Sequence, residues 1–480
     1  MTQYITVIGL EVHAELKTKT KAFCSCSTEF GGLPNTHVCP VCLGMPGALP
    51  VLNRQVVEFA IKAGLALNCD INKVNKFDRK NYFYPDLAKN YQISQLYMPI
   101  CEHGHIDIVL DGQEKRIGVT RIHMEEDAGK LVHSGATIST SDSSAVDYNR
   151  AGVPLIEIVS EPDMRSAEEA RAYMENLKAI LEYIDVCDCK MQEGSLRCDA
   201  NISLMPVGAK EFGTRAEIKN LNSFRALERA IRYEVERQRE ILEDGGRIVQ
   251  ETRTWDEANG VTLSMRSKEE AHDYRYFPDP DLVPVNLDDA WIERVRETLP
   301  ELPAQRKERL VSQFGLTEYD AAQIVSVKAM AEYFDAAAKD AKDAKGVANW
   351  MLGDVSAYLN SENLSIEQFP VAPAALAELV NLLKDGVINS KAGKQIFAEM
   401  VKGGGSPKEL VKKLGLEQVS DAGAIEALVD AVLAANPQSV ADFKAGKDKA
   451  IGFLTGQVMK QSKGKANPPM VQQMLREKMQ

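Results

Sequence analysis

Carboxylates and histidines, the side chains with which a protein can bind Mg²⁺ or move protons, recur in short apolar stretches of this 480-residue chain. In the stretch 9–16, Glu11, His13 and Glu15 alternate with apolar residues. If the stretch is a β-strand, these three side chains share one face, because strand side chains repeat every two residues. Such a face is typical of a strand exposed to water or of a metal site, and the pattern leaves both interpretations open.

A second acidic group is the run of carboxylates Glu125, Glu126 and Asp127, which follows an apolar stretch. Adjacent carboxylates repel one another unless a cation lies among them, and Mg²⁺ prefers carboxylate and water ligands. Glu157 lies in the middle of a further apolar stretch, where an ionised carboxylate needs a partner or a metal. These residues predict an acidic, magnesium-type site.

Cations and polar groups from other stretches could complete this site. Arg197, Asp199 and Asn201 alternate, so they would share one strand face. Further positive charges come from Arg79, Lys80 and Lys89. Carboxylates that hold Mg²⁺ and cations that neutralise phosphate oxygens are the components of phosphoryl transfer from ATP. The sequence contains neither a P-loop nor a kinase or Rossmann glycine motif, so the residues alone predict a metal-dependent site without naming its nucleotide.

Four cysteines form two close pairs, Cys24 with Cys26 and Cys39 with Cys42. Two such pairs can place four thiolates around one Zn²⁺, and a site closed by four thiolates is structural. The alternatives are four unligated cysteines or a redox pair. The other cysteines have no spacing that predicts a second site: Cys69, Cys101, Cys187, Cys189 and Cys198.

The composition is that of an ordinary globular protein, with 44% hydrophobic and 26% charged residues. No apolar run of about 18 residues predicts a membrane span, and the N-terminus lacks a basic leader, so we expect a cytoplasmic protein without a membrane partner. The net charge is -12, yet residues 401–480 carry 12 Lys and Arg against 8 Asp and Glu. This basic tail is consistent with binding to a polyanion or with an ordinary solvated surface.

The elements that must position these groups indicate an α+β fold. Strand-like runs occur at 5–8, 106–110 and 154–159. They do not alternate regularly with helices, which favours a mixed or antiparallel sheet for residues 1–290. Helices are predicted over 166–184 and 223–243, where Ser166 and Ser223 are suitable N-caps.

Two breaks divide the rest of the chain. A proline-rich stretch, 278–284, precedes a region whose patterns are helical throughout, 291–402. Glycines and a proline at 403–407 then form a linker before a small helical tail. The sequence therefore predicts three domains, at 1–290, 291–402 and 406–480.

The polar stretches are long and specific, and together they resemble the B subunits of aspartyl/glutamyl-tRNA(Asn/Gln) amidotransferases. The resemblance covers essentially the whole chain. The matching stretches are 9–16, 77–85, 121–130, 154–163, 192–204 and 217–224. The resemblance implies a cradle-shaped α+β domain with zinc knuckles, followed by an all-helical domain and a tail domain that helps to bind tRNA.

The resemblance also implies an activity. Members of this family use ATP and Mg²⁺ to phosphorylate the side-chain carboxylate of Glu-tRNA(Gln) or Asp-tRNA(Asn). They work in a heterotrimer with an amidase subunit, which releases ammonia from glutamine or asparagine, and a small wrapping subunit. Ammonia then displaces the phosphate to give Gln-tRNA(Gln) or Asn-tRNA(Asn), so the implied chemistry is that of an ATP-dependent carbon–nitrogen ligase.

Carried over position by position, the resemblance implies roles for individual residues. Mg²⁺ ligands are implied at Glu11, His13, Glu125 and Glu126. Catalytic roles are implied for Glu125, Glu126, Glu157, Lys80, Lys89 and Arg197. Nucleotide contacts are implied at Arg79, Asp199 and Asn201. A structural zinc site, present in part of the family, matches Cys24, Cys26, Cys39 and Cys42. Contacts with the tRNA backbone are implied for Lys444, Lys447, Lys449, Lys460, Lys463 and Lys465.

Two alternative functions fit the sequence less well. A non-catalytic tRNA-binding scaffold subunit would not need the carboxylates at 125–127, because they repel a polyanion. A stand-alone ATP-dependent carboxylate ligase for a small molecule would not need the basic tail.

Overall fold

The computed structural model describes residues 3–134, 142–267, 274–417, 422–445, 447, 449–462 and 466–479. Of the tail lysines singled out above, Lys463 and Lys465 lie outside the described residues. The chain divides into two compact units, Met1–Pro303 and Ala304–Gln480, and each is described by itself. A further division of the second unit near residues 402–406 stays a prediction.

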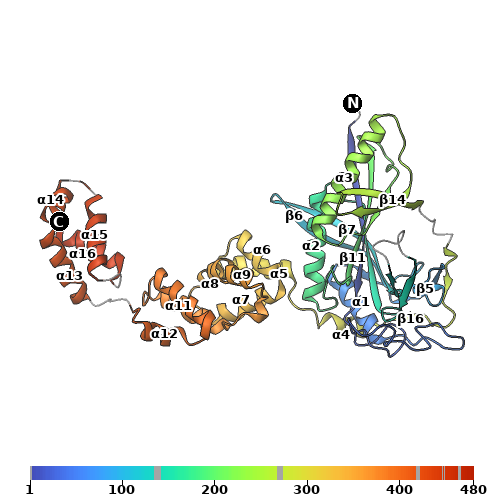
Figure 1. The fold of residues 1–480 in the computed structure, drawn as a ribbon, viewed down its shortest axis with the longest axis horizontal. Coiled ribbons are helices and arrows are strands. Elements are labelled where there is room, and N and C mark those ends of the chain that lie inside the picture. The colour runs from blue at the N-terminus through green and yellow to red at the C-terminus, as the bar shows by residue number, and fades with distance from the viewer. Residues whose placement is uncertain are drawn as a thin grey trace. The chain divides into compact units, whose positions relative to one another are not determined.

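A nine-stranded sheet forms the centre of the first unit (Figure 1). Its strands lie in the order β14-β13-β12-β11-β1-β10-β7-β6-β2. Neighbouring strands pair antiparallel except β12 and β13, which are parallel and are connected through helix α3 (Phe224–Glu243). This mixed sheet confirms the predicted α+β class. The strands are β1 (Tyr4–Glu15), β2 (Asp70–Ile71), β6 (Cys101–Leu110), β7 (Gln113–Glu126), β10 (Pro154–Ser160), β11 (Leu196–Pro206), β12 (Ala216–Lys219), β13 (Glu251–Asp256) and β14 (Val261–Ser267).

Helices α2 (Ala167–Tyr183) and α3 pack against each other. Helix α2 also packs against β6, and α3 also packs against β11. Helix α1 (Arg54–Ala66) packs against β6 and β7. Both α2 and α3 begin where the sequence predicts. Ser166 and Ser223 each accept a hydrogen bond, of 3.1 and 3.0 Å, from the backbone amide three residues further on. These caps satisfy amide groups that have no acceptor within the helix.

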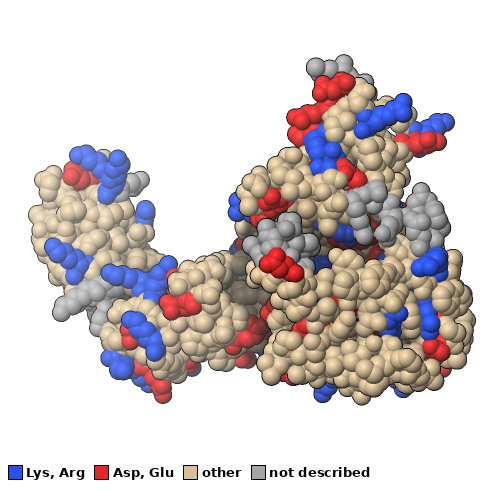
Figure 2. Space-filling view, turned by 45° about the vertical axis from the view of Figure 1, so that its right-hand side comes forward, with Lys and Arg blue, Asp and Glu red and all other residues tan. Residues whose placement is uncertain are grey.

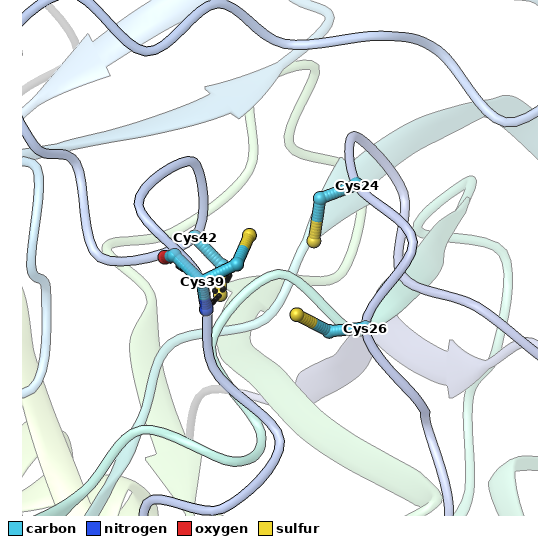
Figure 3. Close-up of side chains that lie close together, drawn as sticks. All are labelled: Cys24, Cys26, Cys39 and Cys42. Atoms are coloured by element: carbon cyan, nitrogen blue, oxygen red, sulfur yellow. Dashed lines mark hydrogen bonds between the residues drawn. The ribbon is translucent and has the colours of Figure 1, made fainter.

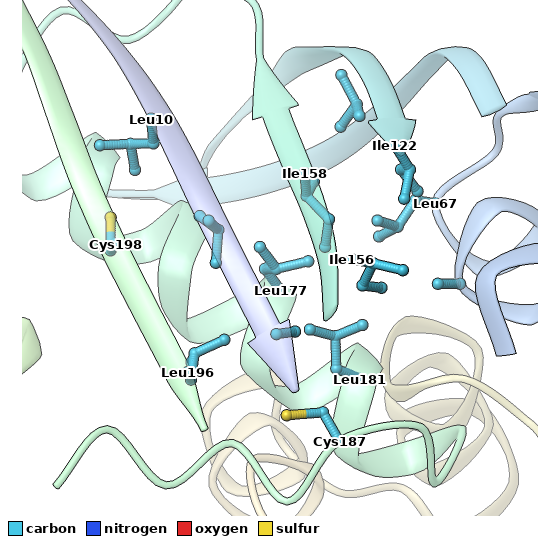
Figure 4. Close-up of a cluster of buried hydrophobic side chains, with 14 of the residues drawn as sticks. Leu10, Leu67, Ile122, Ile156, Ile158, Leu177, Leu181, Cys187, Leu196 and Cys198 are labelled. Carbon is cyan, nitrogen blue, oxygen red and sulfur yellow. The ribbon is translucent and has the colours of Figure 1, made fainter. Parts of the chain in front are cut away.

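Strand β1 has two different faces. Leu10, Val12 and Ala14 are fully buried, and together with Leu177 and Leu181 of α2 they belong to the main hydrophobic core (Figure 4). The polar residues between them point to the opposite face, as the two-residue repeat predicts. Helices therefore cover one face of this strand and leave the other face to polar groups.

Smaller sheets complete the described part of the first unit. One contains β15 (Phe277–Pro278), β4 (Asp78–Asn81) and β5 (Tyr91–Ser94), and β4 carries Arg79 and Lys80. The other two pair β16 (Val285–Asn286) with β3 (Val74–Asn75), and β8 (Lys130–His133) with β9 (Ser144–Asp147).

Helix α4 (Asp289–Arg296) packs on α1 within the first unit, and the second unit is helical. Its elements are α5 (Pro303–Phe314), α6 (Glu318–Val325), α7 (Lys328–Asp340), α8 (Ala344–Trp350), a π-helical turn (Met351–Val355), α9 (Ser356–Glu362), a 3₁₀ turn (Ile366–Gln368), α10 (Pro373–Lys384), α11 (Ser390–Gly403), α12 (Pro407–Leu414), α13 (Ala422–Ala435), α14 (Pro437–Lys444), α15 (Lys449–Gln461) and α16 (Pro468–Met479). Helices α13 to α16 share a hydrophobic core of their own. No helix among the described residues is both long and apolar enough to cross a membrane.

Leu177→Ala should lower the free energy of unfolding of the first unit by about 2–5 kcal/mol, because it removes a fully buried side chain and leaves a cavity. Leu49→Ala is the matched control, since the Leu49 side chain is exposed, and its effect should stay within about 0.5 kcal/mol. Pulse proteolysis across a urea series, scored on fragments of the first unit, measures both values. Equal effects of the two variants would contradict the assigned core.

Candidate active site

One row of polar side chains crosses neighbouring strands of the main sheet. On β1, His13 lies opposite Arg197 of β11 and Glu157 of β10. Glu157 in turn lies opposite His123 of β7. Paired residues on adjacent strands point to the same face of a sheet, so these four side chains project from the face opposite the helices.

A second row lies two residues away along β1. Glu11 lies opposite Asp199 of β11, and the side-chain amide of Asn201 donates a hydrogen bond of 2.9 Å to the Glu11 carboxylate. Lys219 of β12 forms an ion pair of 2.5 Å with Asp199. Alternate residues of adjacent strands therefore build one polar surface that extends from β7 to β12.

Three of these side chains are close enough to share one metal ion. His13 Nε2 lies 3.5 Å from Glu125 Oε1 and 3.4 Å from Glu157 Oε2, and one ligand atom of each residue lies within 4.8 Å of the others. The side chains of Glu125 and Glu157 are only 3% and 13% exposed. A buried and a partly buried carboxylate beside an imidazole are a donor set that fits a divalent cation.

Charges within this group compensate one another. Burial alone would lower the pKa of His13, but the carboxylates of Glu157 and Glu125 outweigh it and raise that pKa to about 9. Burial would likewise raise the pKa of Glu157, yet His123 and His13 hold it well below its ordinary value. His123 and His13 are therefore the neighbours that favour ionisation of the Glu157 carboxylate.

A second charged group is centred on Asp127. Arg197 Nη2 donates a hydrogen bond of 2.8 Å to this carboxylate, and Arg150 Nε lies 3.4 Å from it. Burial opposes the ionisation of Asp127, but Arg197 and Arg150 hold its pKa below the ordinary value. Burial and the neighbouring Asp127 charge raise the pKa of Glu15 to about 8.

Lys80 adds a positive charge from strand β4. Its ammonium group lies 4.8 Å from the centre of the Tyr274 ring, within the range of a cation–π contact. Burial opposes this charge, but Tyr276, Glu125 and Glu157 raise the pKa of Lys80 above its ordinary value. The side chain therefore stays an ammonium group near the acidic cluster.

These groups surround a cleft of about 990 Å³, which is large enough for a nucleotide together with an acyl group. The predicted site residues that line the cleft are His13, Lys80, Glu125, Arg197 and Asp199.

Other predicted residues have internal partners. Glu126 faces the other side of β7 from Glu125, because the two are adjacent in the strand. There it forms an ion pair with Lys89 and accepts a hydrogen bond of 3.0 Å from a β5 amide. Arg79 is paired at 2.9 Å with Asp279, 200 residues further along the chain. Their predicted roles in catalysis, nucleotide binding and, for Glu126, Mg²⁺ binding stay predictions, as does the Mg²⁺-ligand role of Glu11, which lies outside the group of His13, Glu125 and Glu157.

The site also contains His123, Arg150 and Lys219, which the sequence did not single out, and Asp127, which it indicated only as part of the acidic run 125–127. His123 and Asp127 keep a two-residue spacing with Glu125, which is a signal that they share its face of the strand. Arg150 lies in a turn and follows no periodic pattern, so only its contacts reveal it.

The two cysteine pairs converge although they come from separate turns, and their sulfur atoms face one another (Figure 3). The four sulfurs lie within 4.8 Å of one another, and tetrahedral Zn²⁺ with bonds of about 2.3 Å would separate them by about 3.8 Å. A hydrogen bond from Cys24, a backbone amide at Cys39 and the charge of Lys21 lower the pKa of Cys42 to about 4, against its burial. This arrangement fits one metal ion bound by thiolates.

Two family models match the chain, the GatB/GatE catalytic domain over residues 6–293 and the GatB domain over residues 332–479. The chain is 59% identical over 479 residues to the B subunit of the aspartyl/glutamyl-tRNA(Asn/Gln) amidotransferase of Carboxydothermus hydrogenoformans. It is 60% identical over 477 residues to the protein of that name from Moorella thermoacetica, and 58% over 481 residues to the one from Caldicellulosiruptor saccharolyticus. Each match covers 99% or 100% of both chains.

Without bound metal, His13 should titrate with a pKa of about 9, and Glu157→Gln should lower this pKa towards 6.5 because a negative charge is lost. Since the pKa of the folded protein is the higher one, protonation of His13 stabilises the fold fully below pH 6.5, and this contribution disappears as the pH rises through about 9. NMR titration of histidine-labelled, chelator-treated protein measures the pKa. A value that stays near 9 in Glu157→Gln would contradict the assigned cause.

Proposed function

The chain belongs to the GatB/GatE family of tRNA-dependent amidotransferase subunits, and from this premise we propose that it activates an amino acid already attached to tRNA. The γ-phosphoryl group of ATP would pass to the side-chain carboxylate of Glu-tRNA(Gln) or Asp-tRNA(Asn). Ammonia would then displace the phosphate and give Gln-tRNA(Gln) or Asn-tRNA(Asn). The activation is needed because a carboxylate is a poor electrophile and an acyl phosphate is a good one.

The observation that carries this proposal is the cluster of His13, Glu125 and Glu157, of which His13 and Glu125 line a cleft that also contains fixed cations. These three residues would hold Mg²⁺, which neutralises charge on phosphate oxygens when it is bound. A cluster of buried carboxylates has no use on a surface that only binds tRNA, because it would repel the polyanion.

Cations around the cluster have a direct use in this reaction. Lys80, Arg197 and Lys219 line the cleft, so they can stabilise the negative charge that spreads over the transferring phosphoryl group. Asp199 and Asn201 are proposed to contact the nucleotide from the β11 side of the same surface, and Glu11 is bound by Asn201.

Glu126 and Lys89 are proposed to act in the reaction through their partly buried ion pair. Glu126 directly follows Glu125 at the end of β7, so the pair would fix the orientation of the strand end that carries Glu125. Arg79 is proposed to contact the nucleotide after a change of partner, because Asp279 and Asp281 bind its guanidinium group in this structure.

Ammonia is proposed to come from an amidase subunit that hydrolyses glutamine, in a complex that also contains a small wrapping subunit. Its attack on the acyl phosphate passes through a tetrahedral intermediate, and a sheltered cleft would limit competing hydrolysis. An aminoacyl-tRNA substrate implies that the chain works in the cytoplasm.

The tail is proposed to bind the tRNA backbone. Lysine and arginine side chains are scattered over the face of the tail seen in Figure 2 rather than gathered in one patch. Scattered cations are suited to contacts with phosphates. Such contacts are sensitive to salt and do not depend on the base sequence. The second candidate function is a tRNA-binding scaffold subunit without catalysis. The tail lysines are as consistent with this function as with the catalytic one.

Glu125→Gln should lower ADP formation by the reconstituted complex on Glu-tRNA(Gln) about 100-fold or more, because it removes a charged ligand from the cluster. Binding of the tRNA should change little. Glu114→Gln is the matched control, since Glu114 lies on the same strand with an exposed side chain. If Glu125→Gln forms ADP at the rate of the unmodified complex, the scaffold function is favoured instead.

A structural zinc ion is also proposed, held by Cys24, Cys26, Cys39 and Cys42. Protein purified without chelators should contain about one zinc per chain by mass spectrometry of metals, and Cys42→Ser should lose it. Cys69→Ser should keep it, because Cys69 lies outside this cluster. A chain that binds no zinc with all four thiols reduced would refute the site.

A further inference from the structure

Lys21 is a buried cation in the first unit. Its side chain is 0% exposed, and its ammonium group donates hydrogen bonds to the backbone carbonyls of His37 at 2.7 Å and Tyr148 at 3.3 Å. It also lies 3.6 Å from the sulfur of Cys42. Among the described residues, the hydrogen-bond partners of this ammonium group are these two carbonyls and this sulfur.

A buried ammonium group is costly unless a negative charge compensates it. Two carbonyl dipoles compensate it only in part. Four thiolates around Zn²⁺ carry a net charge of two negative units, and this charge also has to be compensated in a partly buried site. The positive charge of Lys21 and the net negative charge of the zinc–thiolate centre would therefore compensate each other.

We propose that Lys21 is the charge partner of the zinc–thiolate centre and that this centre, through Lys21 and the neighbouring contacts of its segment, holds the turn 148–152, which forms one wall of the cleft. The inference rests on the proposed zinc site and is independent of the reaction that the cleft performs. Lys21 acts here as a positioning residue, because it contacts a metal ligand and a backbone carbonyl rather than a substrate.

Further contacts join the zinc-binding segment to the same turn. The backbone amide of Tyr148 donates a hydrogen bond of 2.8 Å to the Asn35 side chain, and that of His37 donates one of 2.8 Å to the Asn149 side chain. The side-chain amide of Asn149 donates in turn to the carbonyl of Leu33 at 2.7 Å. The zinc-binding segment and the turn are therefore fastened together by contacts besides those of Lys21.

The turn 148–152 connects the zinc-binding segment with residues of the cleft. Arg150 donates a hydrogen bond of 2.7 Å to the carbonyl of Gly129 and reaches the Asp127 carboxylate. Gly152 donates from its amide to the carbonyl of Asp127 at 2.9 Å. A Cβ atom on Gly152 would lie 3.4 Å from the Lys21 stem and 3.5 Å from Cys42, so the turn packs directly on both.

Lys21→Met tests the charge partnership in the full chain, because methionine keeps an unbranched apolar stem and removes the charge. Zinc release to a coloured chelator should become about tenfold to 100-fold faster, the range found when a partner of metal ligands is removed. Lys19→Met is the matched control, since Lys19 is exposed two residues away and its variant should release zinc at the original rate.

Unchanged zinc release in a folded Lys21→Met chain would overturn the inference, while absence of zinc from the unmodified chain would refute the zinc site itself. Cobalt substitution gives a second readout, because thiolate-to-cobalt absorption bands report whether all four cysteines still bind. Weaker bands in Lys21→Met than in Lys19→Met are expected. Equal bands would count against the proposal.

Hydrogen exchange on the unmodified chain tests the second part without any variant. Removal of zinc by a chelator should increase exchange in peptides that cover residues 143–153 about tenfold or more, whereas peptides from α2 should not change. Unchanged exchange at 143–153 after complete zinc removal would show that the centre does not hold the turn. This experiment stays decisive if Lys21→Met does not fold.

Discussion

The two-residue repeat of strand β1 is the constraint on which the rest of the first unit depends. Leu10, Val12 and Ala14 are buried against the helices, so Glu11, His13 and Glu15 must face the other way. A shift of one residue in its pairing would move the apolar set out of the core, and burial therefore pins the register. Because β1 lies between β10 and β11, that register aligns the polar residues of three strands at once.

Charge compensation then determines how the polar face is arranged. Carboxylates at this depth are stable only with cations beside them, and histidine, arginine and lysine side chains supply these cations from neighbouring strands. The groups are fixed by the sheet before any substrate arrives. Such preorganised charge suits a reaction in which negative charge moves between oxygens, because little reorganisation is needed during the reaction.

Irregular loops also position side chains of the candidate site. The segment with the four cysteines and the turn at 148–152 are irregular, yet hydrogen bonds join them and position Arg150 beside Asp127. Gly44 has a φ of +63°, and a Cβ atom there would come within 2.5 Å of Lys89 Cγ, so this close approach requires glycine. Functional loops on a rigid sheet are common, and the proposed metal site would add rigidity to these loops.

Local patterns in the sequence determined the alternating face of β1, the caps at Ser166 and Ser223, the pairing of the cysteines and the resemblance to a family. These features depend on residues that lie a few positions apart in the chain, so the periodicity and spacing of the sequence reveal them. Tertiary structure alone decided that Glu157 lies between His13 and His123, that Arg79 binds Asp279 and that Arg150 reaches the cleft. The physical reason is that strand order and loop contacts depend on which distant surfaces bury each other best, and no local repeat encodes that choice.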